Sequence, residues 1–69
     1  MKHDPVKSSH IKSVAHDPEQ QVLEIKFMDG STHEYHGVPA EVHKAMVASK
    51  SVGQFFNSKV KHGYMSRKK

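Results

Sequence analysis

An alternating run that ends in a turn signal constrains this chain more than any other feature of its sequence. Leu23, Ile25 and Phe27 alternate with charged residues, and Asp29-Gly30 follows almost directly. Successive side chains of a strand point to opposite faces, so the run is typical of a strand with one buried face. Asp-Gly favours a tight turn between antiparallel strands. The sequence therefore predicts a central hairpin, with strands at about 22–28 and 32–38.

The length of the hairpin loop decides which face Tyr35 occupies. A two-residue loop would put Tyr35 on the face opposite Leu23 and Ile25. A three-residue loop, with Gly30 left-handed in a bulge, would pair Phe27 with Ser31 and bring His33 and Tyr35 onto the apolar face. We favour the three-residue loop, because the other register would turn a row of polar side chains toward the core.

A third strand and two short helices complete the predicted fold. The strand at about 9–15 alternates poorly, and Ile11, Ser13 and Ala15 are expected to share one face. Pro39 suits the first turn of a helix, and Ser51 suits the N-cap of a second one. We expect an α+β fold, in which a three-stranded antiparallel sheet is packed on one face by two helices. The helices are expected at about 39–49 and 51–62, in a single domain at 8–65 between a flexible arm at 1–7 and a frayed basic tail at 66–69.

The second predicted helix raises two questions about packing. Gly53 lies inside it and weakens it by about 1 kcal/mol relative to alanine, which a close approach to the sheet would explain. Phe55 and Phe56 point about 100° apart on a helix, so an exposed Phe56 would mark a protein contact surface. We favour burial of both rings, because phenylalanine is usually internal. Tyr64 and Met65 are expected to fold back onto the core.

Seven short pieces of the sequence follow one another over residues 8–65: Ser8-Ser9-His10-Ile11-Lys12-Ser13, Asp17-Pro18, Leu23-x-Ile25-x-Phe27, Gly30, Tyr35-x-Gly37-Val38-Pro39, Ser51-x-Gly53-x-Phe55-Phe56-Asn57 and Tyr64. Taken in this order, they resemble the KTSC domain, a module found at the C-terminus of some lysyl-tRNA synthetases and as a small free-standing bacterial or phage protein. The resemblance implies a small α+β domain and no established activity, although RNA binding has been suggested for the family. The family carries a central Tyr-x-Tyr, in which His33 replaces the first tyrosine here, and histidine can also stack on a base.

The charge of the chain is divided between its two halves. All seven acidic residues lie between Asp4 and Glu41, and the chain from Lys44 onward carries only basic charge. A field of one sign favours polyanions, and lysine and arginine side chains can neutralise phosphates. We therefore expect a non-catalytic binding module with RNA as partner, and we expect a log–log salt slope of magnitude about 3–5. The candidate contacts are Lys50, Lys59, Lys61, Arg67, Lys68 and Lys69 for phosphates, with Tyr35 and His33 for stacking.

Two other functions stay open. A protein-interaction module would dock a partner on the sheet edge and on exposed aromatic rings. A small enzyme acting on an anionic substrate would need a pocket with two titratable groups whose pKa values are shifted in opposite directions. No spacing of serine, histidine and acid marks a catalytic motif, so we expect no catalytic residues.

Composition argues against several other classes. The chain has no cysteine, which excludes disulfides and thiolate zinc sites. Its histidines lack the spacing of metal ligands, so neither a metal nor another cofactor is expected. No apolar run approaches the 18 or so residues that span a bilayer, and the N-terminus does not resemble a signal peptide. A cytoplasmic monomer that does not interact with membranes is the expectation.

Overall fold

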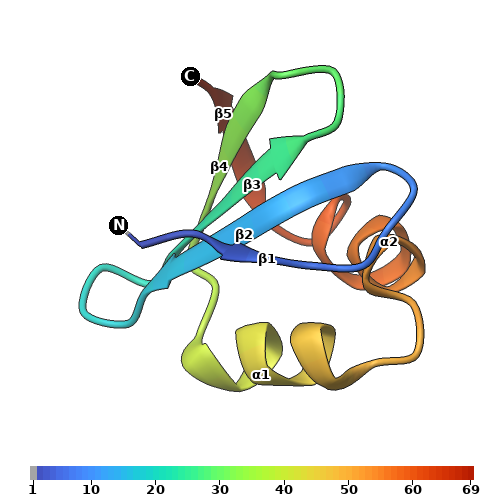
Figure 1. Cartoon of the computed structure of the whole chain (residues 1–69). Coiled ribbons are helices and arrows are strands. Elements are labelled where there is room, and N and C mark those ends of the chain that lie inside the picture. The colour runs from blue at the N-terminus through green and yellow to red at the C-terminus, as the bar shows by residue number, and fades with distance from the viewer. Residues whose placement is uncertain (1) are drawn as a thin grey trace.

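The central hairpin consists of β3 (Val22–Phe27) and β4 (Thr32–His36), in a computed structural model that describes residues 2–69 (Figure 1). The N–H of Phe27 donates to the carbonyl of Ser31 at 2.8 Å, and Gly30 has a φ of +92°. The three-residue loop is therefore confirmed, and with it the register that pairs Leu23 with Tyr35. Glycine suits this loop because a side chain strains the left-handed conformation.

The first predicted strand is β2 (Ile11–Asp17), and a bulge explains its poor alternation. The register with β3 shifts between Ile11 and Ser13, so Lys12 is an extra residue. Ile11 and Val14 consequently both reach the core cluster. The expectation that Ile11, Ser13 and Ala15 share one face is wrong, because the bulge reverses the alternation after Ile11.

The sheet has five strands in the order β1-β2-β3-β4-β5, so the prediction of three strands is wrong. β1 (Asp4–Pro5) lies in the predicted arm and pairs with β2, and β5 (Met65–Lys68) lies mainly in the predicted tail and pairs with β4. Met1, the first residue of that arm, lies outside the described residues. Both added strands are exposed along their length. They bury no apolar face, and the apolar pattern that reveals a strand in a sequence is therefore absent from them.

The helical segments lie between β4 and β5 in the chain and cover one face of the sheet. α1 (Ala40–Ala48) begins after Pro39, and α2 (Val52–Phe55) begins after Ser51. The Ser51 hydroxyl accepts the N–H of Gln54 at 3.3 Å, as expected of an N-cap. α2 continues directly into η1 (Phe56–Val60), a π-helical segment in which the N–H of Lys61 donates to the carbonyl of Phe56. The two predicted helices are thus confirmed, and the second is α-helical only in its first part.

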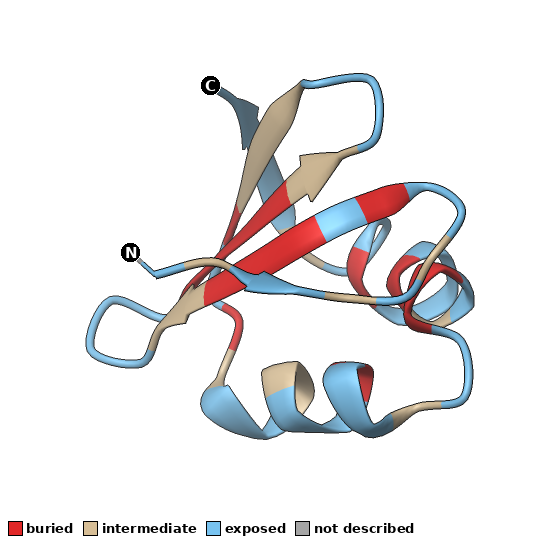
Figure 2. Ribbon diagram, viewed as in Figure 1, coloured by how far each residue is buried: buried red, intermediate tan, exposed pale blue. Residues whose placement is uncertain are grey.

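The core lies between the inner face of the sheet and these helices (Figure 2). Phe56 is 4% exposed, and its ring packs edge-on against the rings of Tyr35 and Phe27. Burial of Phe56 is therefore confirmed, while Phe55 is only half-buried. Tyr64 packs against the core as expected, but Met65 is 81% exposed, so its expected return to the core is wrong. The buried apolar cluster consists of Ile11, Val14, Leu23, Ile25, Tyr35, Val38, Met46, Val52, Phe56 and Val60.

In the described part of the chain, no helix has both the length and the apolar composition that a membrane span requires.

Candidate nucleic-acid interface

The aromatic residues proposed for stacking lie on the inner face of β4. Tyr35 is 4% exposed, and burial raises the pKa of its phenol. Its ring meets the ring of Phe56 edge-on at 5.1 Å, so it offers no free face to a base. His33 is half-buried, and its ring lies edge-on against Phe27 at 5.3 Å. The stacking role expected for Tyr35 is therefore incompatible with its position in the core.

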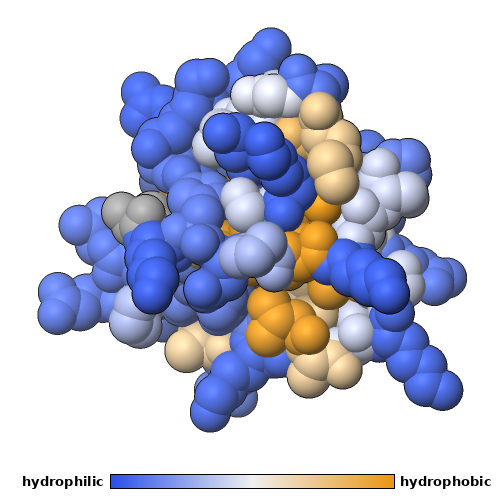
Figure 3. Space-filling view, in the orientation of Figure 1, coloured by the Kyte–Doolittle hydropathy of each residue, from blue (hydrophilic) through white to orange (hydrophobic). Residues whose placement is uncertain are grey.

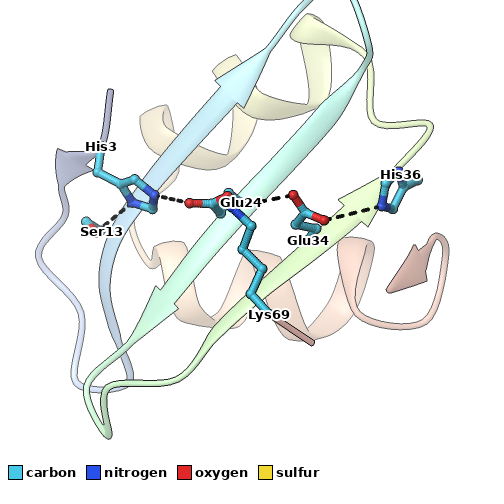
Figure 4. A network of polar contacts seen from close by, with 6 residues as sticks. All are labelled: His3, Ser13, Glu24, Glu34, His36 and Lys69. Atoms are coloured by element: carbon cyan, nitrogen blue, oxygen red, sulfur yellow. Dashed lines mark hydrogen bonds and ion pairs between the residues drawn. The ribbon is translucent and has the colours of Figure 1, made fainter. Parts of the chain in front are cut away.

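Lys69 takes part in an ion-pair network on the outer face of the sheet, opposite the helices (Figure 4). Its ammonium group lies 2.8 Å from Oε2 of Glu24 and 3.7 Å from Oε2 of Glu34. The hydrogen bond to Glu24 raises the pKa of Lys69 and lowers that of Glu24. Two carboxylates thus offset this cation, which leaves it poorly suited to bind a phosphate.

The remaining predicted cations are divided between two parts of the molecule. Arg67 and Lys68 lie on β5, at one edge of the sheet. Lys50 precedes α2, Lys59 lies in η1, and Lys61 follows η1. Lys50 and Lys59 line one hollow and Arg67 lines another, so the structure does not bring the six predicted cations together in one hollow.

Two adjoining hollows lie where the chain segment at 7–10 meets the start of α2. One has a volume of about 430 Å³ and the other about 320 Å³, and both are lined by Lys50, Ser51 and Gln54. Lys7 lines the larger hollow and Lys59 the smaller one. We call the residues that line either hollow the acid-free face: Lys7, Ser8, Ser9, His10, Ser49, Lys50, Ser51, Gly53, Gln54, Phe55, Asn57, Ser58 and Lys59.

The composition of the acid-free face suits a polyanion. It carries three lysines and no carboxylate, and for residues 2–69 no ion pair within 4 Å involves any of these lysines. Its serine, glutamine and asparagine side chains can donate hydrogen bonds to phosphate and sugar oxygens. The half-buried ring of Phe55 lies on the same face. Positive charge next to an aromatic ring is the combination that binds single strands.

A third hollow, of about 260 Å³, extends the acid-free face toward the sheet. It shares His10, Gly53 and Asn57 with the larger hollow, and Phe27 also lines it. His33 contacts Phe27 but does not line the hollow itself. His33 therefore packs against Phe27 from outside the hollow, and of these two rings only the half-buried Phe27 lines the hollow.

Gly53 and Ser8 allow the helix to approach the segment at 7–10. A Cβ atom on Gly53 would lie 3.0 Å from Oγ of Ser8, so the expected close approach is to Ser8, the residue three positions before β2, and not to the sheet. The Ser8 hydroxyl also accepts the N–H groups of His10 and Ile11, both at 3.2 Å. The segment that begins at Ser8 and the helix that begins after Ser51 are therefore in close contact at the acid-free face.

The sequence interpretation missed Lys7 and undervalued Phe55. Lys7 was assigned to a flexible arm, and no charge pattern connects it to Lys50, which lies 43 positions later. A signal was nevertheless present, because Ser8-Ser9 and Ser51-x-Gly53 both belong to the family resemblance. Because both pieces belong to the same family pattern, the sequence could have suggested that their neighbours Lys7 and Lys50 lie close together.

The described residues contain no group of three or more histidine, aspartate or glutamate side chains that could hold a metal ion. Two histidine rings, His16 in β2 and His43 in α1, stack on each other. Their centroids are 5.1 Å apart and their planes differ by 8°.

The comparisons with known proteins agree with this fold. A family model described as the KTSC domain matches residues 7–64. An uncharacterized protein of Stutzerimonas stutzeri strain A1501 is 42% identical over 57 residues, which cover 83% of this chain and 80% of that protein. A protein of Tsukamurella paurometabola is also 42% identical over 57 residues, which cover 83% and 85% of the two chains. The crystal structure of a KTSC domain protein from Yersinia pestis has a TM-score of 0.95 and 37% identity, covering 99% of this chain and 96% of that one.

Proposed function

This chain belongs to the KTSC domain family, and from that premise we propose that it is a small non-catalytic module that binds single-stranded RNA through the acid-free face. The observation that carries the proposal is the lining of two adjoining hollows by Lys7, Lys50 and Lys59 without any carboxylate. On the outer face of the sheet, by contrast, Glu24 and Glu34 offset the charge of Lys69. A polyanion is therefore attracted to the acid-free face and not to the outer face of the sheet.

Each group of residues on this face has a role in the proposed complex. The three lysines contact phosphates, and the hydroxyl and amide side chains bind phosphate and sugar oxygens. Phe55 and Phe27 supply ring surface for unstacked bases, the part that Tyr35 was expected to play. Lys61, Arg67 and Lys68 lie outside the hollows and contribute to the long-range field only. No cofactor takes part, and the module acts as a cytoplasmic monomer.

The test is a titration of a short single-stranded RNA at several salt concentrations, followed by fluorescence anisotropy. Three phosphate contacts predict a log–log salt slope of magnitude about 2, at about 0.7 per contact for single strands, in place of the slope of about 3–5 expected from the larger set of cations. Replacing Lys7, Lys50 and Lys59 by glutamine should weaken binding at least tenfold. Lys2, Lys12 and Lys44 are exposed and lie outside the face, so glutamine at these three positions is a control with the same change in net charge.

Equal losses in the two triple variants would show that net charge alone drives binding, and would refute the proposed face. Binding that does not depend on salt would also refute it, because the lysines would then contact no phosphate.

The second candidate is a protein-interaction module that uses the edge of the sheet, and one observation favours it. In the described sheet, β5 pairs with β4 on one side only, and its four residues are exposed. Met65 lines a hollow of about 540 Å³ together with His36 and Arg67. An unpaired edge is a template for a strand from a partner. A Met65→Ser variant that binds RNA normally, but loses a protein partner that the parent chain binds, would favour this candidate.

A further inference from the structure

A groove of about 410 Å³ separates the chain segment at 4–7 from α1 and the start of α2, and it shares Lys7, Ser49 and Lys50 with the two hollows of the acid-free face. Pro5, Val6, Val47 and Val52 provide apolar lining. Figure 3 shows hydrophobic surface at the centre of this side of the molecule, bordered by long hydrophilic side chains. A volume above about 300 Å³ is in the range of small-molecule sites.

Val47 leaves part of the apolar lining of the groove open to solvent. It is 42% exposed, although α1 otherwise exposes mainly polar and small residues. Leaving apolar area in water forgoes about 25 cal/mol per Å², which an apolar group lying on Val47 would recover. The groove therefore suits a ligand with an aliphatic part.

The charged residues that line the groove determine which polar group the ligand should carry. Lys7 and Lys50 both line it, and Asp4 is the one carboxylate that the described lining contains. His43 also lines the groove; burial and its neighbour His16 lower its pKa, which keeps the ring uncharged near neutral pH. The lining thus has a net charge of +1 and favours an anion of a single charge, since Asp4 opposes a second negative charge.

We infer that this groove binds a small aliphatic monocarboxylate, with its carboxylate at Lys7 and Lys50 and its hydrocarbon chain on Val6, Val47 and Val52. An extended peptide suits the groove less well. Pro5 has no N–H to offer, and the N–H of Val6 already donates to the carbonyl of Lys12 at 3.2 Å. A peptide backbone would leave polar groups unpaired here, whereas a fatty acid chain has none.

A nucleic acid suits the groove less well for a different reason. Its lining contains no phenylalanine, tyrosine or tryptophan within residues 2–69 on which a base could stack, and Asp4 would repel a phosphate diester chain. The inference differs from the proposed RNA binding in its apolar contacts, Val6, Val47 and Val52, whereas Lys7, Ser49 and Lys50 line both surfaces.

The experiment compares three six-carbon probes, hexanoate, hexanol and hexylamine, in NMR titrations that follow the valine methyl groups and backbone amides. Hexanoate should give saturable shifts at Val6, Val47 and Val52 with a Kd in the millimolar range or below. Hexanol should bind at least tenfold more weakly, because it lacks the charge that Lys7 and Lys50 attract. Hexylamine should not bind. Equal affinities for hexanoate and hexanol, or shifts spread over the whole molecule, would overturn the inference.

Two variants separate this inference from the proposed RNA binding. Val47 lines the groove only, and Lys59 lines the acid-free face only. Val47→Asp should lose hexanoate binding at least tenfold and keep RNA binding within threefold. Lys59→Gln should weaken RNA binding and leave the hexanoate titration unchanged. Val47 is largely exposed, so the aspartate is compatible with folding, and an amide spectrum verifies it. Retention of hexanoate affinity in a folded Val47→Asp variant would overturn the inference.

Discussion

His43 shows at the scale of one residue how tertiary contacts change the chemistry of a side chain. In the sequence it is one of seven histidines, and no spacing there distinguishes it from the others. In the fold it stacks on His16, whose Nε2 lies 2.7 Å from the carbonyl oxygen of Val38. The Nε2 atom of His43 is buried and has no hydrogen-bond partner within residues 2–69. Burial first, and His16 second, lower the pKa of His43, while Asp4 from β1 opposes them.

This lowered pKa predicts a loss of stability in mild acid. The unfolded chain binds a proton at His43 near pH 6.5, whereas the folded chain binds it only at lower pH. Its contribution to the free energy of unfolding is therefore fully present above about pH 6.5 and declines as the pH falls toward the folded value. Urea denaturation at pH 7.5 and 5.5 should show a smaller decline for His43→Gln than for the parent chain.

The control for this measurement is His62→Gln, because His62 is exposed. It should reproduce the decline of the parent chain. An unchanged decline in His43→Gln would assign the acid sensitivity to other groups.

At the scale of the element, the contact between Ser8 and Gly53 sets how closely α2 approaches the chain segment at 7–10. A glycine costs a helix about 1 kcal/mol relative to alanine, so its presence here has a local cost. Glycine is nevertheless suited to this position, because a Cβ atom here would lie only 3.0 Å from Oγ of Ser8 and would crowd it. Two segments more than 40 positions apart thereby share one tight contact, on which the larger hollow of the acid-free face depends.

A double-mutant cycle tests this contact. In the parent chain, Gly53→Ala should fail to stabilise, because the new methyl group meets the Ser8 hydroxyl. In a Ser8→Ala background the same substitution should raise the free energy of unfolding by about 1 kcal/mol, the intrinsic preference of a helix for alanine. Equal effects in the two backgrounds, measured by urea denaturation, would show that the hydroxyl does not limit the approach.

At the scale of the whole molecule, both ends of the chain are joined through one carboxylate on the central strand. β1 and β5 lie at opposite edges of the sheet, yet His3 and Lys69 both reach Glu24, at 2.5 Å and 2.8 Å. Glu24 is only 7% exposed, and its bonds to Lys69 and His3 lower its pKa. Carboxylates thereby offset Lys69, whereas Lys7, Lys50 and Lys59 of the acid-free face take part in no ion pair within residues 2–69.

Replacing Glu24 by glutamine should lower the free energy of unfolding at pH 7 by about 1 kcal/mol, the scale of a partly exposed charged hydrogen bond. Because the folded pKa lies below the unfolded value of about 4.3, the contribution of Glu24 is present above that pH and is lost as the pH falls below it. The difference between parent and variant should therefore shrink between pH 5 and pH 2. The control is Glu19→Gln, an exposed turn residue. A difference that stays constant over this pH range would contradict the role of the charge.

The sequence alone determined the elements that bury an apolar face or begin at a recognisable cap. The alternation around Ile25, the Gly30 turn and the Ser51 cap act over a few residues, so the hairpin and both helices could be predicted from local patterns. The tertiary structure alone decided the rest: the edge strands, the pairing of Lys69 with Glu24 and the meeting of Lys7 with Lys50. Edge pairing and the position of a surface charge depend on which distant residues become neighbours. A local pattern does not show which distant residues become neighbours. An exposed lysine looks the same in the sequence whether or not a carboxylate lies next to it in the fold.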